Sequence, residues 1–460
     1  MSRKTTIVLF PLAALLALTA QQSDVIIKLT KGERAVIALP DLRGAGDAQR
    51  FMDAFNQTLW NDLEASGLFR MAPKSLYPLE VPQRPEDFRP PLPSPPSRAG
   101  VPQPPRRQGP WLSDWSGPPV NANYVAFGYS AVQADQFVLR GWLYNVVQND
   151  LANAQVFGKL YLGPLSEEGA RKTAQEFAAD ILKQFGGASL AGTKIYFVSN
   201  RAGRGVKEIW GMDHDGSNEK PLTSYSSVCT TPAVSPDGTM LAFTSYAAGN
   251  PAIFLHSLET GRRLRFYGPV SSMTATPEFT PDGRQILFSY SIGGWPQIAI
   301  ANLDGSELRR ISYVRAIEVE PKVNPKTGAE IVFVSGRAGA QQIFRMNLDG
   351  TDVRQFTPSE GQASNPAWHP DGQHIAFAWT RGYAPGHFNI FVMDAATRSY
   401  VQLTHGAGRN ENPSWAPDGR HLAFSSNRNG GQQIFTMLAD GTQVRQLTTQ
   451  GQNTMPVWGK

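Results

Sequence analysis

Short apolar stretches bounded by turn residues recur along the C-terminal three fifths of the chain. The run Leu241-Ala-Phe243 follows the turn sequence Ser235-Pro-Asp-Gly238, and similar pairs of turn and apolar run come after it. Runs of this length between turn signals are typical of strands buried between neighbouring sheets. In the turn, proline presets φ at the second position of a type I turn and glycine closes it. The pattern predicts antiparallel strand pairs joined by tight turns.

The turn belongs to a longer phrase that begins at a proline and occurs six times. The copies begin at Pro232, Pro277, Pro321, Pro366, Pro413 and Pro456, at intervals of 43 to 47 residues. A second phrase, which ends in Leu-Thr at Leu222-Thr223 and Leu447-Thr448, runs out of phase with the first. A period in the mid-forties with four short strands is the signature of a β-propeller blade. Six blades are therefore predicted.

The two ends of the repeat region are expected to complete one blade together. Lys194–Arg201 match a second strand without a proline phrase before it, whereas Pro456–Lys460 match a first strand with nothing after it. Joining them closes the ring and removes exposed strand edges. We assign residues 191–460 to a six-bladed, all-β propeller closed by the strand 456–460.

A different pattern in residues 21–190 predicts a small α/β domain. In the first predicted helix, which begins near Asp47 and stops at Gly67, apolar residues recur on one face. A second helix is predicted from Ser166 to Phe185, with Gly186-Gly187 as its stop. The predicted strands are 36–39, 124–129, 137–144 and 155–161.

The interior of this domain is interrupted by a proline-rich insertion at residues 78–119, in which 14 of 42 residues are proline. Proline removes a backbone donor and fixes φ, so we expect no helix and no sheet pairing there. The interpretation we favour is an extended, solvated spacer. The alternative is a ligand for a proline-binding groove.

The N-terminus and the composition indicate an exported protein. Arg3 and Lys4 precede an apolar run over residues 7–18, and small residues follow it, which predicts a signal peptide at 1–20 with cleavage after Ala20. No later apolar stretch is long enough to span a membrane. The net charge of +5 is mild and the arginines are dispersed, which argues against nucleic acid as a partner. The one cysteine, Cys229, forms no intrachain disulfide and is predicted to be structural rather than a reactive thiol.

Candidate catalytic groups are sparse. No G-x-S-x-G pentapeptide of a serine hydrolase occurs, and the seven histidines are not expected to converge on one site. Glu318 and Glu320 are two residues apart and are expected to point to the same side, where they could bind a cation or act as acid and base. The alternative is a solvated loop paired with neighbouring arginines. We assign no catalytic residue, no metal and no cofactor.

The blade geometry predicts where a partner binds. Because strands alternate in direction, the loops after strands two and four lie together on one face, here called the loop face, and the Asp-Gly turns lie on the opposite turn face. Arginine is favoured at interface cores because its planar fork pairs with carboxylates. The alternative is a solvated polar rim. The candidate partner-binding residues are Arg201, Arg204, Arg337, Arg381, Arg409, Asn410, Glu411 and Arg428.

The order of signal peptide, α/β domain and propeller resembles the TolB family, the periplasmic components of the Tol-Pal cell-envelope system. Tyr124-Val-Ala-Phe-Gly128 and Gly158-Lys-Leu-Tyr161 match strands of that family, as does the P-x-x-S-P-D-G phrase. The proline-rich insertion looks longer than is usual there, and Asn324-Pro-Lys-Thr-Gly328 replaces one turn.

The resemblance implies a monomeric, non-catalytic periplasmic scaffold that supports envelope integrity and cell division. One propeller face would bind a peptidoglycan-associated lipoprotein of the Pal type, and an extended segment after the signal peptide would contact a TolA-like inner-membrane protein. The residues of that segment would be Asp24, Val25, Ile26, Ile27 and Lys28. The alternation of polar and apolar residues over the whole segment, Ser23–Gly32, suits a strand added to a partner's sheet, or an ordinary first strand of the domain.

The competing interpretations are an exported propeller that binds cell-wall glycan and a propeller hydrolase or lyase. For glycan binding, Trp295, Tyr383 and Phe388 are the candidate stacking platforms. The tryptophans at 368, 415 and 458 recur in first strands and are expected in the blade core.

Overall fold

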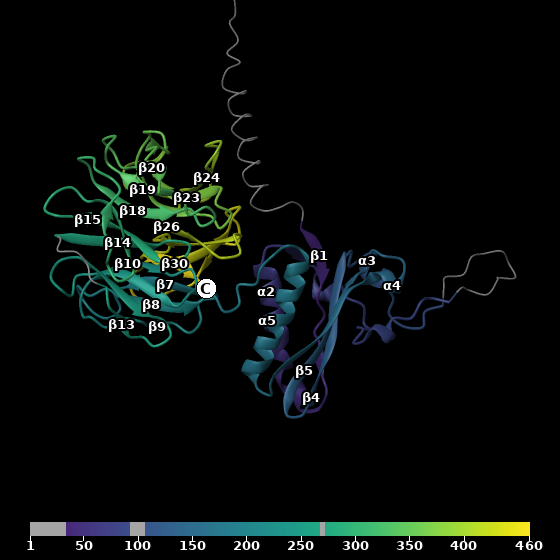
Figure 1. Ribbon diagram of the computed structural model, residues 1–460. Helices are drawn as coiled ribbons and strands as arrows, with labels where there is room; N and C mark the ends of the chain where they lie inside the picture. Colours follow the sequence, from purple (N-terminus) through teal and green to yellow (C-terminus); the bar gives the residue numbers. More distant parts are fainter. Residues whose placement is uncertain (1–33, 93–105, 267–271) are drawn as a thin grey trace, which may run out of the picture. The chain divides into compact units, whose positions relative to one another are not determined.

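The computed structural model describes residues 34–92, 106–266 and 272–460 (Figure 1). The predicted signal peptide at 1–20 and the predicted partner segment Asp24–Lys28 lie outside these ranges. The described chain divides into two compact units, with the boundary between Ala191 and Gly192. Within the described ranges, no helix combines the length and the apolar character that crossing a membrane requires.

The first unit is built on a sheet with the strand order β3-β1-β4-β5-β6, in which β2 also pairs with β4. The strand β1 runs parallel to β3 and β4, and the pairs β4–β5 and β5–β6 are antiparallel. The elements are β1 Ala35–Ala38, β2 Arg43–Gly44, η1 Gly46–Phe51, α2 Met52–Ala65, β3 Phe69–Met71, η2 Lys74–Leu76, η3 Pro85–Asp87, α3 Leu112–Ser116, β4 Tyr124–Gln133, β5 Gln136–Asn145, α4 Leu151–Ala154, β6 Gln155–Pro164 and α5 Glu167–Gln184.

The long helices α2 and α5 lie together against one face of this sheet (Figure 1). Phe55 from α2 and Phe177 from α5 are fully buried in the core between helices and sheet. The predicted end of the first helix and the predicted start of the second are confirmed by their caps, but Asp47 does not cap α2, which begins at Met52 after the short helix η1. Gly67 takes a left-handed conformation after α2, and the Ser166 hydroxyl accepts the Gly169 N–H at the start of α5. The predicted α/β character is confirmed.

The prediction of a purely extended, solvated proline-rich insertion is wrong for its described parts. The helix α3 lies inside it, and backbone hydrogen bonds join Leu92 to Arg106 in both directions. Phe88, Leu112 and Trp115 are buried in a second core with Phe127 on the sheet. The prolines are interrupted by these apolar residues, which pack once the chain returns to the sheet. Residues 93–105 of the insertion lie outside the described ranges.

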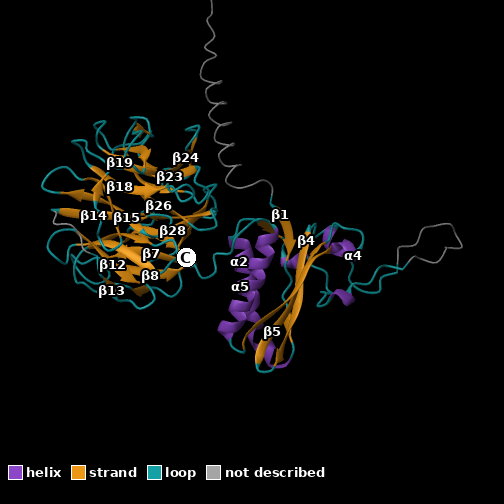
Figure 2. Cartoon of the chain, viewed as in Figure 1, coloured by secondary structure: helices purple, strands orange, loops and turns teal. Residues whose placement is uncertain are grey.

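The second unit contains six four-stranded sheets in the described residues from 192 to 460 (Figure 2), which confirms the predicted six-bladed propeller. In blade order the strands are β30 Asn453–Gly459, β7 Lys194–Ser199, β8 Glu208–Asp213 and β9 Lys220–Pro221; β10 Cys229–Val234, β11 Met240–Ser245, β12 Ala252–Ser257 and β13 Arg263–Leu264; β14 Met273–Phe279, β15 Gln285–Ser291, β16 Gln297–Asn302 and β17 Arg309–Arg310; β18 Glu318–Val323, β19 Glu330–Ser335, β20 Gln342–Asn347 and β21 Arg354–Gln355; β22 Ala363–Trp368, β23 His374–Trp379, β24 Asn389–Asp394 and β25 Tyr400–Gln402; β26 Asn410–Trp415, β27 His421–Ser426, β28 Gln433–Leu438 and β29 Arg445–Gln446.

The last strand closes the ring as predicted. β30 pairs antiparallel with β7, with Trp458 opposite Ile195, and so completes the blade of β7 to β9. The indole N–H of Trp458 donates to the Thr193 hydroxyl at 3.0 Å, between residues 265 positions apart. The two ends of the propeller sequence are therefore held by both a ladder and a side-chain bond.

The tight turns between first and second strands follow the prediction. The Gly238 N–H donates to the Ser235 carbonyl at 2.8 Å, and Gly238 has φ +73°. Positive φ explains why glycine ends the turn. In the blade of β18 to β21, the bond runs instead from the Gly328 N–H to the Asn324 carbonyl, because that turn has one residue more.

The repeated Leu-Thr phrase has a structural reason. The Thr448 hydroxyl accepts the Ile434 N–H at 2.9 Å and donates to the Gln433 side-chain oxygen at 2.7 Å. The hydroxyls of Thr357 and Thr404 make the same pair of bonds in their own blades. Each hydroxyl therefore accepts a buried N–H near the start of a third strand, at a point where the fourth strand no longer pairs with it.

Replacing Thr448 by valine is expected to destabilise the propeller by about 1–3 kcal/mol, because the buried Ile434 N–H loses its acceptor. Equilibrium urea unfolding measures this. The exposed neighbour offers a control, since Thr449→Val should change stability by less than about 0.5 kcal/mol. Equal stabilities for the two variants would contradict the assigned role.

Candidate functional site: the loop face and the channel

The loop face divides into two halves according to the residue that stands two positions after each second strand. Arginine occupies this position in four blades, as Arg201, Arg337, Arg381 and Arg428. In the blades of β11 and β15, Ala247 and Gly293 stand there, and Tyr246 and Ile292 precede them. The four blades with this arginine form the arginine half of the loop face. The loops of the other two blades, together with the connection from β17 to β18, form its apolar half.

Each of these arginines packs inside its own blade. The Arg337 guanidinium lies 5.8 Å from the ring centroid of Phe333 and 5.0 Å from that of Phe344. Arg428 lies over Phe424 and Phe435 in the same way. Phe197 and Trp210 underlie Arg201, and Trp379 and Tyr400 underlie Arg381. The guanidinium therefore covers the edge of the blade core, where cation–π attraction adds to the packing.

Three of these four arginines also bond to the first residue of the first strand of their blade. Arg337 pairs with Glu318, whose side chain is completely buried, and Arg428 donates to Asn410 at 2.8 Å. In the closing blade, Arg201 donates to Asn453 at 3.4 Å. Arg381 faces Ala363 at the equivalent position and pairs instead with Glu360 at 2.7 Å. These arginines are internal struts, which sequence analysis missed because the acceptor lies in another strand.

The other predicted partner residues differ in exposure. Asn410 is fully buried, so it positions Arg428 and is not itself available for contact. Glu411 pairs with Arg409 through both carboxylate oxygens, at 2.5 and 2.8 Å. The Arg409 side chain remains 49% exposed, and Arg204 is exposed in the loop after β7. Of the eight predicted residues, Arg204 and Arg409 are the two that are exposed.

The apolar half carries five large exposed side chains on neighbouring loops. Trp295 is 54% exposed, Ile292 71% and Tyr313 67%, and Tyr246 and Ile317 are also exposed. A hydrogen bond from the Glu318 N–H to the Pro296 carbonyl ties the Trp295 loop to the connection that carries Tyr313 and Ile317. Exposed apolar groups gathered on one face of a soluble protein are typical of an interaction surface.

The three aromatic residues considered for glycan stacking differ in solvent exposure. Trp295 is exposed and Tyr383 is 37% exposed, but Phe388 is buried beneath Arg409 and cannot serve as a platform. That prediction is wrong because Phe388 belongs to the core shared by the last two blades. The expectation for Trp368, Trp415 and Trp458 is confirmed, since each is less than a tenth exposed.

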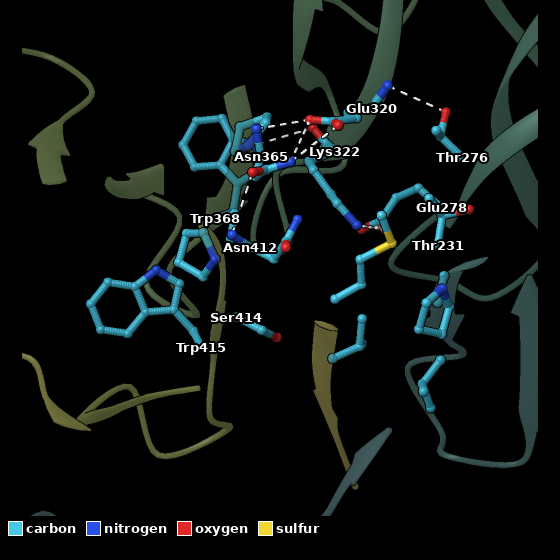
Figure 3. A pocket seen from close by; sticks show the side chains of 18 of the residues that line it. Thr231, Thr276, Glu278, Glu320, Lys322, Asn365, Trp368, Asn412, Ser414 and Trp415 are labelled. Atoms are coloured by element: carbon cyan, nitrogen blue, oxygen red, sulfur yellow. Dashed lines mark hydrogen bonds and ion pairs between the residues drawn. The ribbon is translucent and has the colours of Figure 1, made fainter. Parts of the chain in front are cut away.

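The first strands surround a central cavity of about 270 Å³ (Figure 3). Each first strand is bulged where its proline interrupts the ladder, because proline has no N–H to donate. The residue before each proline has a positive φ of 48° to 56°. These residues are Thr231, Thr276, Glu320, Asn365, Asn412 and Met455. A left-handed conformation is uncommon for threonine and methionine, so the bulges hold local strain around the cavity.

Hydrogen bonds connect this ring from blade to blade. The N–H of Glu320 donates to the Thr276 hydroxyl at 3.3 Å, and the N–H of Asn365 donates to Glu320 Oε2 at 2.8 Å. The N–H of Asn412 in turn faces Asn365 Oδ1 at 3.4 Å. Beside the ring, Lys322 pairs with Glu278 at 2.6 Å. Burial raises the pKa of Glu320, and the Asn365 N–H partly offsets this effect.

Glu318 and Glu320 do not form the carboxylate pair considered from the sequence, and Glu318 instead pairs with a neighbouring arginine, as the alternative expected. Glu318 binds Arg337 and the Ser335 hydroxyl in its own blade, whereas Glu320 binds Asn365 of the next blade. The expectation assumed regular strand alternation, but the bulge at Glu320 breaks it. The two carboxylates therefore serve separate interactions.

The expectation that the seven histidines do not converge is wrong for two of them. His369 and His374 stand at the two ends of one tight turn, and both contact Asp371. In the described residues they form the one group of three histidine, cysteine or carboxylate side chains whose candidate ligand atoms lie within 4.8 Å of one another. The six-residue turn brings its two end residues, His369 and His374, close together. Considering each histidine separately did not predict this contact.

Cys229 is buried at the start of β10, where other blades place the acceptor of the strut arginine. Burial raises the pKa of its thiol to about 11. Relative to a free thiol, this corresponds to a roughly 100-fold lower thiolate fraction near neutral pH. We expect a disulfide reagent at pH 8 to label Cys229 at least that much more slowly in the native protein than in urea, while comparable rates would contradict its structural role.

The propeller part of the chain is similar to known proteins. A family model described as the TolB beta propeller domain matches residues 183–377 and 355–460. These ranges cover more than half of the chain. The chain belongs to the TolB beta-propeller family. A "Protein TolB homolog" from Chlorobium chlorochromatii is 34% identical over 147 residues, which span 32% of this chain and 32% of that protein.

Two further relatives extend the match. A "Tol-Pal system protein TolB" from Cereibacter sphaeroides is 28% identical over 253 residues, 53% of this chain and 50% of the relative. The chain thus spans a third to a half of the length of these curated relatives. The crystal structure of TolB from Acinetobacter baumannii superposes with a TM-score of 0.73 at 22% identity, and covers 93% of this chain and 97% of that one. Its likeness shows the same two-part fold.

Proposed function

We propose that the chain is a non-catalytic periplasmic scaffold of a Tol-Pal-type system, whose loop face binds a peptidoglycan-associated lipoprotein. The observation that carries the proposal is the apolar half of the loop face, with five large exposed side chains on neighbouring loops of a closed propeller. Membership of the TolB family and relatives named as Tol-Pal system proteins support it. A rigid scaffold that presents variable loops suits recognition.

The two halves of the loop face have different tasks in this proposal. Trp295, Tyr313 and Ile292 provide buried contact area, as large apolar and aromatic side chains do at the centre of interfaces. Arg204 and Arg409 provide exposed positive charge at the rim, which steers a partner and sets its orientation. The strut arginines act indirectly by keeping the loops in place.

Hydrogen exchange with and without the soluble domain of the lipoprotein tests the docking face. We expect slower amide exchange in peptides covering residues 292–297 and 313–317 of the loop face. Peptides over the turn at 236–239, on the opposite face, should be unchanged. Protection confined to the turn face would contradict the assignment.

The segment Asp24–Lys28 remains the predicted contact for a TolA-like inner-membrane protein. Its three consecutive β-branched residues Val25, Ile26 and Ile27 stand between Asp24 and Lys28, and such a run suits strand addition. Replacing all three by serine should abolish binding of the soluble domain of that partner and leave lipoprotein binding unchanged. Unaltered binding of both partners would exclude this segment.

Export and cleavage after Ala20 have a direct test. Intact-mass measurement on protein recovered from the periplasmic fraction should give a chain that begins at Gln21. A chain that retains residues 1–20, or that stays in the cytoplasm, would contradict the proposed location.

Glycan binding is the second candidate function, and the exposed Trp295 indole favours it. Aromatic faces stack on the apolar faces of sugars. A calorimetric titration with soluble peptidoglycan fragments distinguishes the two proposals, since the scaffold proposal predicts no saturable heat in the absence of the lipoprotein.

A further inference from the structure

The turn between β22 and β23 differs from its relatives in the side chains at its ends. The sequence is His369-Pro-Asp-Gly-Gln-His374, whereas the equivalent turns begin with Ser235, Thr280 or Ala416. Ser235 donates its hydroxyl proton to Asp237, and Thr280 does the same to Asp282. At His369, an imidazole nitrogen takes the place of that hydroxyl.

Both imidazoles direct their Nδ1 atoms to the carboxylate of Asp371. His369 Nδ1 lies 2.9 Å from Asp371 Oδ1, and His374 Nδ1 lies 2.8 Å from Oδ2. A carboxyl group is ordinarily an anion at neutral pH. One carboxylate and two imidazole nitrogens, three potential ligand atoms, therefore lie within 4.8 Å of one another.

The tautomer of His369 is set by its other nitrogen. His369 Nε2 lies 2.7 Å from the Gly419 carbonyl of the next blade, and that oxygen can only accept. The proton of a neutral His369 is therefore on Nε2, and Nδ1 keeps its lone pair, which accepts the Asp371 N–H at 3.1 Å. This lone pair also faces the Asp371 carboxylate at 2.9 Å, so two electron-rich atoms stand in contact. A cation next to both atoms relieves that repulsion.

His374 supplies a second, independent indication. Its side chain is 97% buried, and its Nε2 atom has no hydrogen-bond partner among the described residues. The nearest carboxylate is Asp394, with Oδ2 at 4.0 Å. If a metal ion takes His374 Nδ1, the imidazole stays neutral by carrying its proton on Nε2, directed to Asp394. A histidine ligand whose second nitrogen faces a carboxylate is the usual arrangement around protein-bound metals.

From this geometry we propose that His369, Asp371 and His374 form a binding site for a divalent transition metal of the zinc class. Two imidazoles and one carboxylate are a ligand set that Zn²⁺ accepts, with a position left for water. The Asp371 side chain is 33% exposed, which gives solvent access to that position. Because His369 also bonds to Gly419, the ion joins the last two blades on the turn face and stabilises the folded propeller.

The chain contains a matched control for this site. The next blade has the same aspartate–histidine pair, with His421 Nδ1 2.7 Å from Asp418 Oδ2, but Ala416 replaces the first histidine. The substitutions for testing the proposed site can be residues that occupy the same positions in the equivalent turns of other blades. His369→Ser introduces the residue found at Ser235, and His374→Gln introduces the residue found at Gln285.

Tag-free protein, stripped with EDTA, is titrated with ZnCl₂ by calorimetry, and its Tm is recorded with and without the metal. We expect one Zn²⁺ per chain and a higher Tm for both the wild type and His421→Gln. His369→Ser and His374→Gln should each weaken binding by at least about tenfold. X-ray absorption of the wild-type complex should show two imidazole ligands, a readout that does not depend on how the variants fold. Failure of the wild type to bind, undiminished affinity in folded His369→Ser, or a zinc environment without imidazole would overturn the proposal.

Discussion

Replacing Arg337 by alanine is expected to lower the free energy of unfolding of the propeller by about 3–5 kcal/mol. The reason is its partner, since Glu318 is completely buried and loses the positive charge that compensates its carboxylate. The ring faces of Phe333 and Phe344 also lose their cover. The loss is large because an unpaired charge in a low-dielectric site is not hydrated. Equilibrium urea unfolding of the propeller transition measures it.

A double substitution separates the charge effect from a general intolerance of change. Removing both groups, with Arg337→Met and Glu318→Leu together, should recover most of the stability, because no unpaired charge remains. Arg204→Ala, an exposed arginine on the same face, should stay within about 0.5 kcal/mol of the wild type. A cost of less than about 1 kcal/mol for Arg337→Ala would show that the strut is dispensable.

The second large effect concerns binding. Under the proposed function, Trp295→Ala should weaken the affinity for the lipoprotein domain by about 30-fold, the loss expected for a tryptophan at the centre of an interface. Tyr313→Ala should act in the same direction. The effect should appear mainly as faster dissociation, because an apolar contact contributes little to long-range steering. Surface-based kinetics with the immobilised lipoprotein domain measure both rates.

The matched control for Trp295 lies on the opposite face. Val444, in a turn between a third and a fourth strand, is 42% exposed and apolar, so Val444→Ser tests whether any loss of surface hydrophobicity matters. Its affinity should equal that of the wild type. An equal loss in both variants, or no loss with Trp295→Ala, would remove the apolar half of the loop face from the interface.

The architecture of the propeller could be predicted because its local signals repeat. Each turn of the Ser235–Gly238 kind needs a glycine with positive φ, and each second strand is a short apolar run. The closing strand was also predictable, since a first strand at Pro456 had no other partner. These features depend on neighbouring residues, which a single sequence shows directly.

The contacts of the polar residues depend on the pairing register between strands. The sequence does not show this register directly. Arg337 and Glu318 are 19 positions apart and meet because β18 and β19 pair in one register. The pre-proline bulge at Glu320 shifts that register, so the predicted carboxylate pair does not form. One signal was available. An arginine two residues after the second strand accompanies asparagine or glutamate at the start of the first strand in three blades.

The turn between β4 and β5 shows the same limit. Ala134 and Asp135 both have positive φ and connect two ten-residue strands, yet the sequence contains none of the glycine or asparagine that predicts such a turn. Pairing along the whole length of β4 and β5 outweighs the local cost of the turn. The strands were therefore predicted shorter than they are.

Calorimetric titration of residues 21–460 with the soluble domain of the Pal-type lipoprotein from the same cell tests the central claim most directly. The scaffold account predicts saturable one-to-one binding, accompanied by a negative heat-capacity change from burial of the apolar loop-face residues. Absence of heat at two well-separated temperatures, in protein shown to be folded by urea unfolding, would contradict it.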